Sequence, residues 1–162
     1  MKKSSVQLAD EIEYSLHTYG NMLFRLSFAM LGNASDAEDV VQETLIKYIE
    51  KTPEFESEEH RKSWLITVAS NKCKDLIRSH KRHPLVEIEE WNSLVNESID
   101  TGILEALMSL PEKFRLVLIL YYVEEYRVED IATIIGKTKS AVKMRLQKGR
   151  RLLEETYRKE YM

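Results

Sequence analysis

The sequence predicts an all-α protein in which an acidic linker joins two small helical bundles, the C-terminal one with a helix-turn-helix. Apolar residues recur at helical spacing through most of the 162 residues, and no alternating strand pattern persists. Only three prolines and five glycines interrupt the chain, and its abundant Leu, Ile, Glu and Lys favour helices. Residues 84–102 contain five acids, no Lys or Arg and weak periodicity. We therefore expect bundles at residues 1–83 and 103–162, with the linker between them.

Three amphipathic helices are expected in the first bundle, over about residues 16–30, 36–51 and 61–81. Ser35 is predicted to cap the second helix, with Glu38 three residues on as its capping-box partner. The buried faces of these helices are expected to carry Leu16, Tyr19, Leu23, Leu26, Ala29, Met30, Val40, Val41, Leu45, Tyr48, Ile49, Trp64, Leu65, Val68, Ala69, Leu76 and Ile77.

The second bundle is expected to begin near Ile103. Pro111 restarts the chain after a helix break, because proline suits the first turn of a helix. Residues 114–123 are strongly apolar and are expected to form the core helix of this bundle. Two further helices complete it.

The segment 128–151 is predicted to be a helix-turn-helix. Ala132 lies four residues before Gly136 and Val142 lies six after it, which suits two helices that cross closely around a tight turn. In the second helix, the residues expected to face inward are Val142, Leu146, Gly149 and Leu153. Those expected to face outward are Lys143, Met144, Gln147 and Lys148, flanked by Arg145, Arg150 and Arg151.

Positive charge is concentrated in two islands of an otherwise acidic chain, whose formal net charge is -3. Residues 60–83 and 137–151 each carry seven Lys or Arg, and Asp75 is the single acid among them. A solvated surface of mixed sign does not explain this distribution. Two separate contacts with a polyanion explain it.

The outward face of the second island has the chemistry to read bases. Lys143 and Lys148 can donate to guanine edges, and Gln147 can pair bidentately with adenine. The flanking cations suit phosphates, which position a helix and supply most of the affinity. The alternative is a solvated basic helix, which would be expected to carry acids for i,i+4 pairing, and this stretch carries none.

Aromatic and amide residues accompany the first island. Phe55 and Trp64 have rings that can stack on unpaired bases, and Asn71 has an amide that can read an exposed base edge. A structural interpretation stays open beside this one. Trp64 alone fits the core better, and Asn71 also fits a polar surface.

The second helix carries a stripe of acids that includes Asp36, Asp39 and Glu43. No histidine accompanies them, so docking of a basic partner is a better interpretation than catalysis or metal binding. His80 and His83 have metal-like spacing, but two cations lie between them and no further ligands stand nearby. We therefore expect no catalytic residue, no metal and no cofactor.

Cys73 is the only cysteine, so an intrachain disulfide is excluded and a buried structural thiol in a reducing compartment is expected. Residues 1–14 lack the apolar core of a secretory signal. The longest apolar run, Leu116–Val123, is too short to span a bilayer. We expect a soluble, cytoplasmic protein.

Four segments carry a resemblance to a known family: LGNASDAEDVVQET, SWLITVASNKCKDLIR, ALMSLPEKFRLVLIL and EDIATIIGKTKSAVKMRLQKGRRLL. In this order, over about residues 14–155, the chain resembles the extracytoplasmic-function sigma factors of the bacterial sigma-70 family. The resemblance implies a two-domain promoter-specificity subunit of RNA polymerase. Its partners would be core polymerase, promoter DNA and an anti-sigma factor, with no small-molecule substrate and no catalytic activity.

The resemblance also implies roles for individual residues. Polymerase contacts would fall on Asp39, Gln42 and Glu43. The −10 element would be opened and a flipped base captured by Phe55 and Asn71, with Lys72, Lys74 and Arg78 near the DNA backbone. The −35 element would be read in the groove by Lys143, Met144, Gln147 and Lys148, with Arg145, Arg150, Arg151 and Lys137 as further DNA contacts. The acidic linker resembles the segment that threads the active-site and RNA-exit region of polymerase.

Arg127, Met144 and Gly149 depart from the family pattern, Gly149 standing where alanine is common. Arg127 stands where a hydroxyl N-cap is frequent before the helix-turn-helix, a loss of about 1 kcal/mol. Met144 replaces a frequent serine, so the −35 preference of relatives does not transfer to this chain.

Three other functions remain as alternatives. A conventional helix-turn-helix regulator would have one DNA-binding island and a sensor domain, and the second island argues against it. A sigma-like adaptor would bind polymerase but no promoter. An enzyme acting on nucleic acid ranks last, because no metal or acid–base cluster is evident in the sequence.

Overall fold

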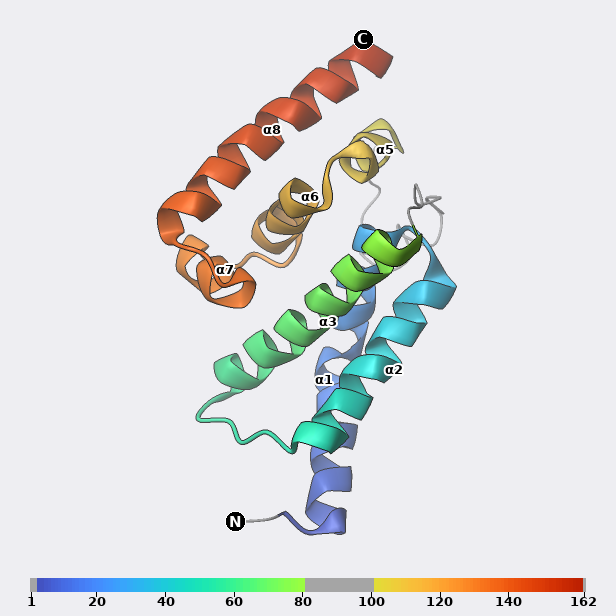
Figure 1. Cartoon of the computed structure of the whole chain (residues 1–162), viewed down its shortest axis with the longest axis vertical. Coiled ribbons are helices and arrows are strands. Elements are labelled where there is room, and N and C mark those ends of the chain that lie inside the picture. The colour runs from blue at the N-terminus through green and yellow to red at the C-terminus, as the bar shows by residue number, and fades with distance from the viewer. Residues whose placement is uncertain (1–2, 81–100, 162) are drawn as a thin grey trace.

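The computed structural model describes residues 3–80 and 101–161, and each regular element within these ranges is a helix (Figure 1). The N-terminal bundle consists of α1 (Ser5–Leu31), α2 (Ala34–Lys51) and α3 (Glu58–His80). The C-terminal bundle consists of α5 (Thr101–Ser109), α6 (Glu112–Leu118), the π-helical turn η1 (Ile119–Val123), α7 (Val128–Ile135) and α8 (Lys139–Tyr161). The expected all-α class with two helical bundles is confirmed. Most of the expected linker, and His83, lie outside the described residues.

The start of α2 differs from the prediction, because Asn33 rather than Ser35 is the N-cap. Asn33 has extended backbone, and its side-chain oxygen accepts a hydrogen bond from the Asp36 amide at 3.0 Å. Asparagine and serine cap helices about equally well, so residue type does not choose between the two positions. The preceding glycine decides it: Gly32 ends α1 in the left-handed conformation, with φ 69°, and leaves Asn33 as the first residue outside.

The three N-terminal helices bury a common core, which includes Leu23, Leu26, Ala29, Met30, Val40, Tyr48, Leu65 and Ala69. The expected core residues that are half-buried are Tyr19, Val41, Leu45, Trp64, Val68, Leu76 and Ile77. The prediction is wrong for Leu16 and Ile49, which are 46% and 51% exposed. Each directly follows a buried residue, Ser15 or Tyr48, and so lies about 100° around its helix from the buried face.

Residues 114–120 are buried in the C-terminal bundle as expected, whereas Tyr121 and Tyr122 are exposed, and the segment is not one continuous α-helix. α6 passes directly into η1, where the Glu124 amide donates to the Ile119 carbonyl at 3.0 Å. Pro111 is the N-cap of α6 rather than a first-turn residue, since its ψ of 144° keeps it outside the helix. A π-helical turn frequently marks a functional position in a helix.

The predicted helix-turn-helix is present as α7, a turn, and α8. Gly136 makes the turn in the left-handed conformation, with φ 68°. Arg127 is the N-cap of α7 and its side chain makes no capping hydrogen bond, as its identity predicts. Gly149 allows α8 to approach α6 closely, because a Cβ there would lie 3.3 Å from the Leu118 side chain.

The two bundles contact each other, with α3 beside α7 (Figure 1). The Thr67 hydroxyl lies 3.4 Å from the Ile134 carbonyl, and the Lys62 ammonium lies 4.8 Å from the centre of the Tyr126 ring. Further ion pairs cross the contact, from Arg25 to Glu124 at 3.3 Å and from Arg78 to Glu112 at 3.6 Å. Among the described helices, none has the length and apolar character needed to cross a membrane.

Candidate nucleic-acid interface

The outward face of α8 exposes the residues expected to read bases. Lys143, Met144, Gln147 and Lys148 are exposed, and Met144 is 69% accessible although it is apolar. On the opposite side, Val142, Leu146 and Gly149 are buried and Leu153 is half-buried. The predicted division of α8 into an inward and an outward face is therefore confirmed, while the DNA-reading role of the outward residues stays a prediction.

An aromatic ring lies beneath this face, and the sequence assigned it only to the core. The Lys148 and Lys113 ammonium groups lie 5.5 Å and 5.1 Å from the centre of the Phe114 ring, within cation–π range. Phe114 thus forms the floor of a shallow groove that Met144 and Gln147 also line. Its place in an apolar run gave no signal of this second role.

The cations predicted to bind phosphates make only weak contacts within the protein; Arg145 and Arg151 line the groove, whereas Arg150 lies beside Tyr122. The Arg150 guanidinium donates to the Tyr122 hydroxyl at 2.9 Å, and Arg151 lies 3.9 Å from the Glu155 carboxylate. Exposed pairs of this kind contribute little to stability. Arg150, Arg151 and Lys137 are exposed and Arg145 is half-buried, so these side chains remain accessible to phosphate oxygens.

A cluster of aromatic rings lies at the start of α3, around the connector 52–57. Phe55 packs against Tyr48, Trp64 and His60, with ring centres 5.8, 5.9 and 5.3 Å apart. Phe55 and Trp64 are both half-buried. Each ring is therefore held in place by its neighbours, which for Phe55 include the Arg61 guanidinium at 5.1 Å from the ring centre, and is partly accessible, as a stacking platform requires.

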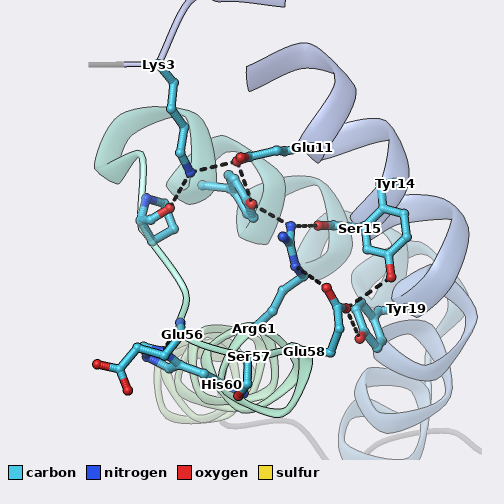
Figure 2. A network of polar contacts seen from close by, with 12 residues as sticks. Lys3, Glu11, Tyr14, Ser15, Tyr19, Glu56, Ser57, Glu58, His60 and Arg61 are labelled. Carbon is cyan, nitrogen blue, oxygen red and sulfur yellow. Dashed lines mark hydrogen bonds and ion pairs between the residues drawn. The ribbon is translucent and has the colours of Figure 1, made fainter. Parts of the chain in front are cut away.

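Arg61 is the centre of a polar network that joins the three N-terminal helices (Figure 2). Its guanidinium donates to the Tyr48 hydroxyl at 2.9 Å and to the Ser15 hydroxyl at 3.2 Å. Its Nε lies 3.4 Å from the Glu58 carboxylate, which accepts a hydrogen bond from Tyr19 at 2.6 Å. The bond from Tyr19 is the main reason that the pKa of Glu58 lies below its ordinary value, and burial with the same bond raises the pKa of Tyr19 to about 12.

The network continues to the N-terminal end of α1 through Glu11. The Glu11 carboxylate accepts hydrogen bonds from Tyr48 at 3.1 Å and from Lys3 at 2.7 Å. Burial alone would raise the pKa of Glu11, but these two bonds and the charges of Lys3 and Arg61 outweigh it, so the pKa is lowered. Lys3 also donates to the Pro53 carbonyl at 2.6 Å (Figure 2). The sequence gave no signal for either Lys3 or Glu11.

The remaining residues predicted for the −10 element lie further along α3. Asn71 is exposed and follows Trp64 by seven residues, which places it two turns, or about 10 Å, along the same face. Arg78 is exposed, whereas Lys72 and Lys74 are half-buried. Burial lowers the pKa of Lys74. The charge of Glu112 raises this pKa, while the charges of nearby cations, of which Arg145 has the largest effect, lower it further. The contact between the bundles thus brings Lys74 of the first cationic island near Arg145 of the second.

The residues predicted to bind polymerase share the outer side of α2. Asp39, Gln42 and Glu43 are exposed there. Ile46 and Ile49 extend the same side by two further turns, and they are 45% and 51% exposed. The sequence analysis missed these two isoleucines, which form an exposed apolar surface directly beside the acidic one on α2.

Two expectations about the chemistry of the chain can be compared with the described residues. Cys73 is buried, as expected, and burial raises the pKa of its thiol to about 12. Within residues 3–80 and 101–161, no group of three or more His, Cys, Asp or Glu side chains has the arrangement of a metal site.

Two family models match this chain. The model of Sigma-70 region 2 matches residues 16–83, and that of Sigma-70, region 4 matches residues 101–153. The chain is 31% identical to the RNA polymerase sigma factor SigV of Bacillus subtilis (strain 168), over 85% of each chain. It is 26% identical to the ECF RNA polymerase sigma factor SigW of the same organism, over 86% of this chain and 85% of SigW.

Two solved structures share the fold. One is the sigma factor RpoE in complex with the anti-sigma factor NepR from Bartonella quintana, with a TM-score of 0.71 and 23% identity over 93% of this chain and 98% of RpoE. The other is CnrH in complex with the cytosolic domain of CnrY, with a TM-score of 0.71 and 19% identity over 92% of this chain and 88% of CnrH.

Proposed function

This chain belongs to the extracytoplasmic-function sigma factors of the sigma-70 family, and on that premise we propose that it directs core RNA polymerase to promoters through two separate DNA contacts. The observation that carries the proposal is the pair of cationic faces, one on α3 and one on α8, each beside residues suited to bases. Both faces fall inside the segments that the region 2 and region 4 models match.

The C-terminal bundle, residues 103–162, reads the −35 element. α8 enters the major groove with Lys143, Met144, Gln147 and Lys148 toward base edges. Arg145, Arg150, Arg151 and Lys137 bind phosphates, which fix the register of the helix on the duplex. The exposure of these side chains and the buried opposite face of α8 support this assignment.

The N-terminal bundle, residues 1–83, opens the −10 element and captures an unpaired base. Phe55 and Asn71 take the base, and Lys72, Lys74 and Arg78 bind the DNA backbone. The fixed but accessible ring of Phe55 supports the first role, and the position of Asn71 on the face of Trp64 supports the second.

The protein works in the cytoplasm with core polymerase and has no catalytic activity of its own. Asp39, Gln42 and Glu43 bind the core enzyme, and the acidic linker at residues 84–102 passes through it. An anti-sigma factor holds the protein inactive, a proposal supported by the solved structure of RpoE, which shares this fold and contains such a factor.

Transcription with purified components tests the proposal. We expect this chain and core polymerase together to give discrete transcripts from a library of genomic fragments, and neither component alone to do so. Binding to core polymerase without any promoter-dependent transcript would instead establish the adaptor alternative. Tight, sequence-specific binding of DNA by this chain without core polymerase would favour a conventional regulator.

A further inference from the structure

The connector 52–57 is attached to the N-terminal end of the chain by one lysine. The Lys3 ammonium donates to the Pro53 carbonyl at 2.6 Å and to the Glu11 carboxylate at 2.7 Å. The side chains of Lys3 and Glu11 are only 16% and 29% exposed. This differs from an ordinary surface ion pair, because two acceptors hold the ammonium and most of it is removed from solvent.

The attachment acts on the first half of the connector, because the hydrogen bonds at its other end, from the Glu56 amide to His60 Nδ1 at 3.2 Å and from the His60 amide to the Ser57 hydroxyl at 3.0 Å, hold only the approach to α3. Thr52 ends α2 in the left-handed conformation, with φ 41°, which residues other than glycine rarely adopt. Pro53 has no amide hydrogen, so its carbonyl is the one backbone hydrogen-bonding group it offers. A donor on that carbonyl fixes the direction in which the chain leaves α2 toward Phe55, two residues on.

The same carboxylate connects Lys3 to the aromatic cluster. Glu11 Oε2 accepts from Lys3 and also from the Tyr48 hydroxyl, at 3.1 Å. The Tyr48 ring packs edge-on against Phe55 and Trp64. Lys3 therefore constrains Phe55 in two ways, through the backbone of Pro53 and through the orientation of Tyr48.

We propose that Lys3 is a positioning residue for capture of the unpaired −10 base, and that it acts by fixing the connector so that Phe55 faces the DNA. The inference rests on the proposed role of Phe55 at the −10 element. Lys3 itself does not contact the base; it sets the geometry of the residues that do.

The experiment measures binding of holoenzyme to a single-stranded oligonucleotide that carries the non-template −10 sequence of a promoter this holoenzyme transcribes. A series of oligonucleotides with one abasic site at each position in turn locates the captured base. At that position, Phe55→Ala and base removal should not be additive, because both remove the same contact. If no position shows this coupling, the proposed role of Phe55 fails, whatever Lys3 does.

Lys3→Met should weaken binding of the intact oligonucleotide about fivefold, the size expected for the loss of one ordinary hydrogen bond. The loss should disappear on the oligonucleotide that lacks the captured base. Lys3→Arg keeps the positive charge and can still donate to both Glu11 and the Pro53 carbonyl, so it should restore binding to within about twofold.

Glu11→Gln is the decisive companion variant, since it removes the opposite charge. A general electrostatic effect on DNA affinity would have opposite signs in Lys3→Met and Glu11→Gln, whereas loss of positioning gives the same sign in both. Lys159→Met, at an exposed position of α8, removes an equal charge outside the network and should leave base discrimination unchanged.

Thermal unfolding of each variant separates positioning from loss of the fold. The inference is overturned if Phe55 shows the coupling but Lys3→Met binds like the unmodified protein. It is equally overturned if Lys3→Met loses the same affinity for the intact and the abasic strands, or if the arginine variant fails to restore binding while its melting temperature is unchanged.

Discussion

The acidic and phenolic groups around Arg61 shift the pKa values of one another. Tyr48 donates to Glu11 and accepts from Arg61, so its hydroxyl connects a carboxylate on α1 to a guanidinium on α3. Tyr126 and Glu124, near the other bundle, each retain one buried polar atom without a hydrogen bond. Buried polar groups that lack partners destabilise a contact. The Arg61 network also has such an atom, Nε, but this atom lies 3.4 Å from the Glu58 carboxylate, and the hydrogen bonds of the other groups stabilise the N-terminal bundle.

Glu11 gives the fold a predictable dependence on pH. Its pKa in the folded protein lies below the ordinary 4.5, so its ionised form stabilises the fold. This contribution is fully present above the unfolded pKa and is lost as pH falls through the folded pKa. Urea unfolding of the protein and Glu11→Gln should show a difference in stability near neutral pH that shrinks below pH 4.5. A difference that grows toward acid pH would contradict the assignment.

Cys73 should be unreactive in the native protein. Its side chain is fully buried and burial raises the pKa of the thiol to about 12, so neither access nor thiolate is available at neutral pH. Iodoacetamide should alkylate it only after denaturant is added. Alkylation at similar rates with and without denaturant would show that α3 opens readily from its neighbours.

At the scale of elements, the close approach of α8 to α6 is determined by Gly149. A Cβ at this position would meet Leu118 at 3.3 Å and Phe114 at 3.5 Å, so larger side chains force α6 away. Gly149→Val should lower the free energy of unfolding by about 2 kcal/mol, as for overpacked cores generally. Lys159→Val measures the cost of a β-branched residue at an exposed position of the same helix. Equal losses in the two variants would exclude a packing role for Gly149.

The outward face of α8 should determine which −35 sequences are used. Substituting Lys143 and Gln147 removes base-edge donors, each worth about 1–3 kcal/mol of discrimination. Sequencing of transcripts from a randomised −35 library should show relaxed preference at one or two positions for each variant. Arg151→Ala should instead lower transcription from all promoters alike, since phosphate contacts carry no sequence information. An unchanged promoter profile in the Lys143 and Gln147 variants would refute their assignment.

Periodicity predicted the helices well because it records which side of an element is apolar. It placed Val142 and Leu146 inward and Met144 outward, and each is found there. It failed at the edge of a buried face, where a shift of one residue changes a side chain from buried to exposed, as for Ile49 beside Tyr48.

Contacts that depend on the far ends of long side chains lie beyond what periodicity reports. The hydroxyl of Tyr48 and the ammonium of Lys3 meet Glu11 across three separate segments, and spacing along the chain carries no trace of this. The ring of Phe114 serves the core and the groove at once, while an apolar run indicates only the core.

At the scale of the whole molecule, the contact between the bundles is incompatible with simultaneous binding of two promoter elements. Elements centred at −10 and −35 are about 25 base pairs, or about 85 Å, apart along a duplex. In the structure α3 and α7 touch, and Arg25 pairs with the nearly buried Glu124. If each bundle binds one of these elements, as proposed, the bundles must separate when the protein occupies a promoter.

Reversing the Arg25–Glu124 pair tests this requirement. Arg25→Glu leaves a buried carboxylate facing a second one, so it should separate the bundles and increase the radius of gyration of the free chain. It should also strengthen binding to core polymerase several-fold if the separated form is the one bound. The double variant with Glu124→Arg should restore both values. Scattering and a core-binding titration measure them, and a single variant as compact as the unmodified chain would contradict the prediction.

The contact at Arg25 and Glu124 also makes the two ligands of this protein thermodynamically linked. Whichever ligand first separates the bundles supplies the free energy of opening, and the second then binds to a chain that is already open. Linkage is reciprocal, so polymerase must raise the affinity for promoter DNA by the same factor by which the promoter raises the affinity for polymerase. A ligand that bridges the closed bundles would lower both affinities together. The free energy of the contact between the bundles, to which this ion pair contributes, thus sets the size of the cooperativity between the two ligands.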